Sequence, residues 1–155
     1  MRILIVGADS KYAIERPYLK YLSQHLSVSA IELFAAQQIF LGWYQKSIFN
    51  KIAYRAGLSR ILHTINEDLL RTVASFKPDV LFVFKGMEIF PSTLKTIKEK
   101  GIKLTNYNPD NPFIFSGRGS GNKNVTNSIP LFDLFMSYDR GICREMESRF
   151  NIPSR

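Results

Sequence analysis

The sequence predicts an α/β fold: a single open, doubly wound domain of the Rossmann-like or flavodoxin-like kind, with a mostly parallel five-stranded sheet. Two apolar runs, RILIVG at 2–7 and KPDVLFVFKG at 77–86, end in glycine and have the character of strands buried on both faces. Helical periodicity separates such runs, so consecutive strands need crossover connections and lie parallel. The 155 residues suffice for one domain with a real core.

The other elements follow from periodicity and from residues that begin or end helices. Pro17 is tolerated in the first turn of a helix, and Pro91 begins a helix that Gly101 ends. The predicted order is strand 2–7, helix 14–26, strand 28–34, a helical region 36–76 broken at 56–58, strand 77–86, helix 91–100, strand 102–107, loop 108–130, strand 131–138 and helix 139–150.

The long helical region carries two apolar faces, which we expect to pack into the core. The first face comes before the break and the second follows it. They comprise Ile39, Phe40, Trp43, Ile48, Phe49 and Ile52, and then Ile61, Leu62, Ile65, Leu69 and Val73.

The charge is strongly positive, with a formal net charge of +8 and an isoelectric point near 9.7. No acidic residue lies between Glu32 and Glu67, whereas Lys46, Lys51, Arg55 and Arg60 do, so the 46–60 region is basic. This region is either a solvated helix face or a patch that contacts an acceptor or a membrane surface. Nucleic acid is disfavoured as a partner, because the aromatic residues occupy core positions rather than stacking platforms.

Cysteine usage and the first residues indicate a cytoplasmic location, with peripheral membrane contact as an open alternative. Cys143 is the single cysteine, and Met1 leads directly into an apolar strand without the features of a signal peptide. No apolar run approaches the ~20 residues of a membrane span. No group of residues has metal-ligand spacing, so we expect no metal.

Ligands of open α/β sheets bind at the carboxyl ends of the strands, which here are followed by GADSKY, KGME, NYNPDNP and SYDRG. The first of these lacks the second and third glycines of GxGxxG, and no P-loop motif is present. A response-regulator receiver is excluded as well, because Lys85 stands where the phosphate-accepting aspartate would be needed.

Both histidines, His25 and His63, lie on predicted helices away from the strand ends, so a general base would have to be a carboxylate. Asp139 is better explained as a helix N-cap, and Asp110 is either a functional group or part of an Asx-turn. Lys85 ends an apolar strand and should point into the crevice or sit at its rim. The acidic residues near the crevice are Asp9, Glu15, Glu88, Asp110 and Asp139.

The glycine-rich segment GRGSGNK at 117–123 has two interpretations. It would cradle a phosphate if NKNVTNSI formed a short helix, or it would serve as a mobile lid or plain loop, which we favour.

Several motifs occur in an order that resembles a known family. They are MRILIVG, the Glu15-Arg16-Pro17 triplet, KPDVLFVFKG, NYNPDNP and FDLFMSYDRG. This set is similar to the N-terminal half of GT-B glycosyltransferases of the spore-maturation-protein (CgeB-like) group. The resemblance implies that residues 1–155 form a Rossmann-like, acceptor-side domain, with a C-terminal donor-binding domain absent from this chain.

The resemblance also implies roles for individual residues. A sugar or other hydroxyl acceptor would bind above the strand ends, and a carboxylate would take its proton, Asp9 being our first choice and Asp110 the second. The loop 113–123 would close over the site. The expected substrate-binding residues are Ser10, Glu15, Lys85, Gly86, Asn108 and Asn111.

We therefore predict the acceptor-binding half of an enzyme that transfers a sugar from a nucleotide-sugar donor to a hydroxyl. No cofactor is expected in this half, and the half alone should be inactive. The alternative is a stand-alone flavodoxin-like binding module for an anionic partner or nucleic acid, whose binding would weaken steeply with salt.

Overall fold

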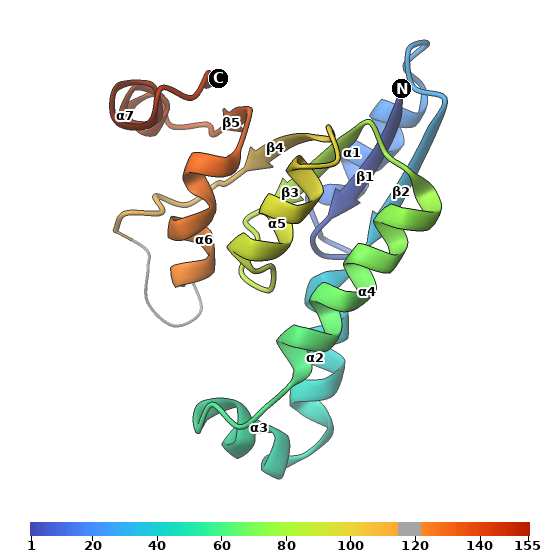
Figure 1. The fold of residues 1–155 in the computed structure, drawn as a ribbon, viewed down its shortest axis with the longest axis vertical. Helices are drawn as coiled ribbons and strands as arrows, with labels where there is room; N and C mark the ends of the chain where they lie inside the picture. The colour runs from blue at the N-terminus through green and yellow to red at the C-terminus, as the bar shows by residue number, and fades with distance from the viewer. Residues whose placement is uncertain (115–121) are drawn as a thin grey trace.

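A computed structural model describes residues 1–114 and 122–155. Its centre is a five-stranded sheet in which every pairing is parallel, with the order β2-β1-β3-β4-β5 (Figure 1). The predicted fold class, an open Rossmann-like α/β sheet, is confirmed. The strands are β1 (Arg2–Val6), β2 (Ala30–Phe34), β3 (Val80–Phe84), β4 (Lys103–Tyr107) and β5 (Leu134–Met136).

Helices connect the strands in the expected alternation. They are α1 (Glu15–Ser23), α2 (Ala36–Lys46), α3 (Ile48–Arg55), α4 (Ile61–Phe76), α5 (Pro91–Lys98), α6 (Lys123–Ser128), the short 3₁₀ helix η1 (Ile129–Leu131) and α7 (Arg140–Phe150). None of the described helices is both long and apolar enough to cross a membrane.

The core forms on both faces of the sheet because side chains alternate along each strand. Leu4 and Val6 of β1 face α4 and α5, in a cluster with Leu69 and Ile97. Ile3 and its neighbours on the opposite face pack against α1. A third cluster joins β5 to α7. The helices that follow β1 and β3 therefore cover opposite faces of the sheet, which makes the gap between these two strands its topological switch point.

Several elements are shorter than predicted. The apolar run at 131–138 contains only a three-residue strand, since η1 occupies its start and the Asp133 carboxylate accepts a hydrogen bond from the Leu104 N–H (2.8 Å). Helix 14–26 ends at Ser23 in turns, where the His25 N–H donates to the Leu22 carbonyl (3.1 Å). The predicted loop 108–130 is wrong in its last part, because Asn122 caps helix α6 through side-chain hydrogen bonds to the Asn124 and Val125 N–H groups, and η1 follows. The Asp139 N-cap is confirmed.

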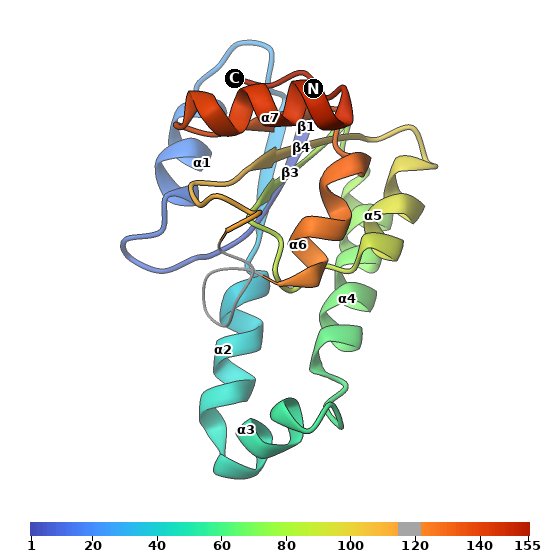
Figure 2. The ribbon, with the colours of Figure 1, turned by 90° about the vertical axis from the view of Figure 1, so that its left-hand side faces the viewer.

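The helical region 36–76 has a second break that the sequence analysis missed. Ser47 is extended, and its hydroxyl accepts a hydrogen bond from the Phe49 N–H (3.1 Å), so α3 begins there as a separate helix. Helices α2 and α4 run away from the sheet side by side and carry α3 at their far end (Figure 2).

This arrangement overturns the prediction that the whole first apolar face packs into the core. Ile48, Phe49 and Ile52 are exposed, because α3 lies beyond the reach of the sheet. The second face does pack as predicted, with Ile65, Leu69 and Val73 buried.

Candidate functional site

A pocket of about 190 Å³ opens at the switch point, where the carboxyl ends of β1 and β3 lie next to each other. Its wall combines polar and apolar groups from α1, α2, β3 and the loops after β1, β3 and β4. The lining residues are Gly7, Ala8, Ile14, Glu15, Gln37, Phe84, Lys85, Met87, Glu88 and Pro109.

Glu15 is held against the end of β1. It stands at the start of α1, is buried, and accepts a hydrogen bond from the Ala8 N–H through Oε1 (2.6 Å). A Cβ atom added at Gly7 would lie only 2.2 Å from the same oxygen. Glycine at position 7 therefore makes room for the carboxylate in the pocket wall.

Lys85 and Gly86 turn the chain sharply at the end of β3, with φ angles of 55° and 92°. The Lys85 ammonium forms an ion pair with Asp110 Oδ2 (2.6 Å), which connects the end of β3 to the loop after β4. The buried Asn106 side chain steadies this turn, because its amide donates to the carbonyls of Val83 (3.0 Å) and Lys85 (3.4 Å).

Glu88 is the second carboxylate of the pocket and lies in the loop after β3. Burial raises its pKa above the usual range of a carboxylate, and the nearby Glu15 charge adds to this effect. The Glu88 main-chain N–H and the Lys85 charge act in the opposite direction. The balance favours the neutral form relative to an ordinary glutamate.

The loop that carries Glu88 is fixed from two sides. From α4, the buried Asn66 amide donates to the Glu88 carbonyl (2.8 Å), and its oxygen accepts from the Phe90 N–H (2.8 Å). From the start of α6, the amides of Asn122 and Asn124 both donate to the Met87 carbonyl (2.8 and 3.0 Å). The wall of the pocket is thus set by contacts from α4 and α6.

The NYNPDNP segment contains two Asx-turns. Asn108 is buried and accepts a hydrogen bond from the Asp110 N–H (3.0 Å), while Asn111 accepts from the Phe113 N–H (2.9 Å). Asparagines thus form the turns, whereas the Asp110 side chain points to Lys85. Asp110 is therefore part of an Asx-turn through its N–H, as one of the two alternatives predicted, while its side chain forms the ion pair.

Asp9 and Ser10 lie apart from the switch-point pocket. Asp9 forms an ion pair with Arg16 (2.8 Å) at the edge of a depression that α1 and Leu33 of β2 line. Ser10 is exposed, and its carbonyl accepts a hydrogen bond from the Ala13 N–H (3.0 Å) in a turn. Gly86 and Asn108 are buried next to the pocket without lining it.

Of the residues that the sequence placed near the crevice, Glu15, Lys85 and Glu88 line the pocket. Asp110 joins them through its ion pair with Lys85. Sequence reasoning missed Gln37 and the positioning residue Asn66. The signal for Asn66 is a polar side chain on the buried stripe that Ile65 and Leu69 define on α4.

Neither histidine contributes to the pocket. The His63 ring packs edge-on against Phe90, with ring centres 5.0 Å apart, and His25 contacts the Ser27 hydroxyl (2.7 Å). Within residues 1–114 and 122–155, no three His, Cys, Asp or Glu side chains gather in a group suited to a metal ion. Most of the glycine-rich segment, and with it the proposed lid, falls at 115–121, outside the described residues.

Two solved structures that this chain matches are each about twice its length. UDP-GlcNAc 2-epimerase from Neisseria meningitidis, bound to UDP-GlcNAc, matches 99% of this chain and 44% of its own, with a TM-score of 0.67 and 15% identity. UGT73P12 from Glycyrrhiza uralensis, complexed with glycyrrhetinic acid 3-O-monoglucuronide, matches 99% of this chain and 47% of its own, with a TM-score of 0.56 and 12% identity.

The chain has the fold of one half of a GT-B enzyme. It spans a little under half the length of these two structures. At such low identity the likeness establishes the fold alone. No protein-family model matches the sequence, and no curated protein matches it.

Proposed function

We propose that this chain is the acceptor-binding, N-terminal half of a GT-B glycosyltransferase resembling the CgeB-like group. The observation that carries the proposal is the pocket at the switch point, which has the three charged side chains of Glu15, Glu88 and Lys85 in its wall. The complete enzyme would transfer a sugar from a nucleotide-sugar donor to a hydroxyl of the bound acceptor. This half alone would bind the acceptor without turning it over.

The chemistry of the pocket suits a sugar or another ligand rich in hydroxyls. A hydroxyl group both donates and accepts hydrogen bonds, so it can pair with carboxylates and with an ammonium group at once. A phosphate would instead meet two carboxylates, Glu15 and Glu88, against one ammonium group, that of Lys85. This charge balance favours the neutral acceptor over an anionic ligand, and it argues against the alternative of a stand-alone anion-binding module.

Asp9 and Asp110 remain the proposed general bases, and the geometry favours Asp110. Its ion pair with Lys85 places it at the rim of the pocket, whereas Asp9 faces a separate depression. In an inverting transfer the carboxylate takes the acceptor proton while the hydroxyl oxygen bonds to the anomeric carbon. The bond from that carbon to the donor phosphate breaks in the same step, and the nucleotide leaves with the electron pair.

Among the predicted binding residues, Glu15 and Lys85 would orient acceptor hydroxyls directly. Gly86, Asn108 and Asn111 would act through the backbone turns that they form. Ser10 would reach only an acceptor that extends past Asp9.

Amide chemical-shift titration of the ¹⁵N-labelled chain tests this assignment. Methyl glycosides should shift the amide signals of Ala8, Lys85 and Glu88, and added salt should leave their affinity nearly unchanged. UDP should leave these signals in place, because the donor nucleotide belongs to the other half. Saturable shifts of the same signals by UDP, or no shift with any glycoside, would overturn the assignment.

The partner expected for this half is a second α/β domain that binds the donor. Sequencing the gene tests this directly, since the reading frame should continue past codon 155 for about as many residues again. A stop codon at that point would count heavily against a two-domain transferase.

A further inference from the structure

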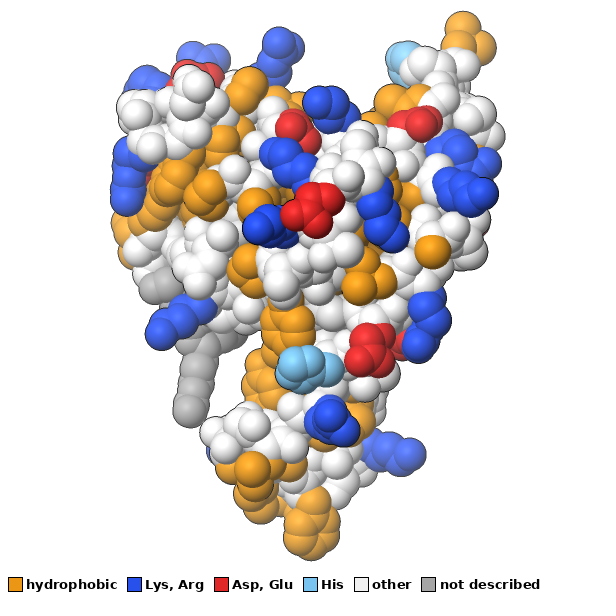
Figure 3. All heavy atoms as spheres, viewed as in Figure 1, with side chains coloured by type: hydrophobic (Ala, Val, Ile, Leu, Met, Phe, Trp, Pro, Cys, Tyr) orange, Lys and Arg blue, Asp and Glu red, His pale blue; other side chains and the backbone are white. Residues whose placement is uncertain are grey.

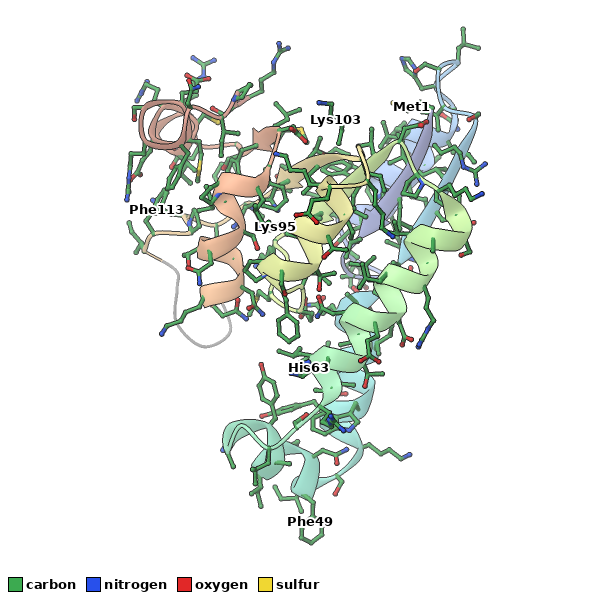
Figure 4. The ribbon with its side chains drawn as sticks, in the orientation of Figure 1. Met1, Phe49, His63, Lys95, Lys103 and Phe113 are labelled. Carbon is green, nitrogen blue, oxygen red and sulfur yellow. The ribbon has the colours of Figure 1, made fainter. Side chains whose placement is uncertain are left out.

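The far end of the helical projection carries apolar side chains that the rest of the protein does not cover. We call residues 46–60, which comprise the end of α2, α3 and the segment that leads to α4, the α3 tip. Exposure reaches 63% for Ile48, 76% for Phe49, 57% for Ile52 and 79% for Leu58. Phe49 lies at the end of the molecule farthest from the sheet and points away from it, as Figure 4 shows.

The contacts between α3 and α2 determine which side chains of the tip are exposed. Phe40 and Tyr44 of α2 pack against Tyr54 of α3, with ring centres 4.9 and 5.8 Å from the Tyr54 ring. The Asn50 amide also donates to the Trp43 carbonyl (2.7 Å). These contacts hold one side of α3 against α2 and leave its other side outward.

Basic side chains surround the exposed apolar ones. Lys46, Arg55 and Arg60 are exposed, and the Lys51 ammonium lies over the Tyr44 ring (5.8 Å). No acidic residue occurs between Glu32 and Glu67, and none of these four forms an ion pair within residues 1–114 and 122–155. Figure 3 shows hydrophobic side chains gathered at the tip, with cationic groups above them.

We propose that the α3 tip binds the surface of an anionic lipid membrane. Phe49, Ile48, Ile52 and Leu58 would enter the boundary between headgroups and acyl chains, while the basic side chains contact lipid phosphates. The absence of acidic residues from the tip favours an anionic membrane as its partner. Such a surface attracts all four basic side chains and meets no acidic side chain of the tip that it would repel. The proposal does not depend on the identity of the pocket's ligand.

Vesicle flotation of the 155-residue chain tests the proposal. The chain should float with vesicles of phosphatidylcholine and phosphatidylglycerol and much less with phosphatidylcholine alone. Phe49→Ser should weaken binding by about tenfold or more, because a buried phenylalanine side chain is lost. Tyr138→Ser is the matched control, since Tyr138 is 75% exposed and follows β5 of the sheet, outside the α3 tip, and it should leave binding unchanged.

A second pair of variants tests the charge. Arg55→Glu should weaken binding to the mixed vesicles by at least about fivefold, since each basic residue near the surface contributes that much. Lys100→Glu changes the net charge equally at an exposed position on the sheet domain and should have little effect.

Three results would overturn the proposal. They are absence of flotation with mixed vesicles, equal flotation with neutral ones, and equal losses in the variants and their controls. Sedimentation velocity distinguishes a rival occupant: a dimer that dissociates in Phe49→Ser would show that a second copy covers the tip. Failure of the glycoside titration leaves these outcomes unaffected, so the two proposals are separable.

Discussion

Replacing Gly7 with alanine probes how tightly the pocket wall is built. The new Cβ would lie 2.2 Å from Glu15 Oε1, so the carboxylate would have to retreat by roughly 1 Å to reach an ordinary contact. The hydrogen bond from the Ala8 N–H, now 2.6 Å, would then lengthen beyond a useful distance. Losing a hydrogen bond to a charged group, with the N–H left in the wall, costs about 1.5–3 kcal/mol.

The effect of Gly7→Ala on the free energy of unfolding should have the opposite sign once the Glu15 side chain is removed. Gly7 does not have a positive φ, so alanine fits its backbone. Gly→Ala at such a position commonly stabilises a protein by about 0.4–1 kcal/mol, because it restricts the unfolded chain. In a Glu15→Ala background the clash is gone, and Gly7→Ala should therefore raise the free energy of unfolding.

Urea unfolding of the four proteins of this double-mutant cycle measures the effect. We expect a coupling free energy between Gly7 and Glu15 of about 1.5–3 kcal/mol. An equal penalty for Gly7→Ala with and without Glu15 would refute the reasoning, since the contact would then not be its cause. Glycoside titration of Gly7→Ala adds a functional reading, because a displaced carboxylate should also weaken binding.

The remaining predictions concern the other groups of the site. The raised pKa of Glu88 makes the folded state lose stability, relative to Glu88→Gln, as pH rises from about 4.5, and a pH-independent difference in urea unfolding would contradict this. Asn66→Ala should lower the free energy of unfolding by about 2–4 kcal/mol, because it leaves main-chain groups of the loop after β3 without their hydrogen-bond partners. Asn127→Ala, at an exposed position, should lower it by less than about 0.5 kcal/mol in the same assay. In the complete enzyme, Asp110→Asn should lower kcat by about 10²-fold or more with little loss of stability, and Asp9→Asn should have a smaller effect. Full transferase activity in both variants would show that neither is the base.

Much of the fold could be predicted because its signals are local. The apolar runs at 2–7 and 77–86 are long enough to indicate buried strands, and helical periodicity between them requires parallel pairing. The break at Ser47 escaped prediction because a serine N-cap inside a helical pattern differs little from a serine on a helix surface.

The exposed tip was mispredicted for a different reason. Periodicity identifies an apolar face of a helix, but it does not say whether another element covers that face. Phe40 and Phe49 belong to the same pattern, yet Phe40 packs against the core and Phe49 is 76% exposed. The two residues differ in burial because α2 runs away from the sheet, so that only its first part lies close to the core.

The site was partly predictable. Lys85 was found because a charge at the end of an apolar strand is unusual, and Glu15 because it follows the loop after β1. Pairing between Lys85 and Asp110 depends on the neighbouring positions of β3 and β4, which no local pattern encodes. The same holds for Asn66, whose partners lie 22 and 24 residues further along the chain.

Helix α4 fixes the distance between the pocket and any surface that the α3 tip contacts. It begins at Ile61, directly after the tip, and Asn66 contacts the pocket loop only five residues later, about 7.5 Å along the helix axis. A helix is a stiff spacer, so a chain seated on a bilayer would hold the pocket at a constant distance from the headgroups. An acceptor anchored in that bilayer would then reach the pocket only if the length of its polar part matched this distance.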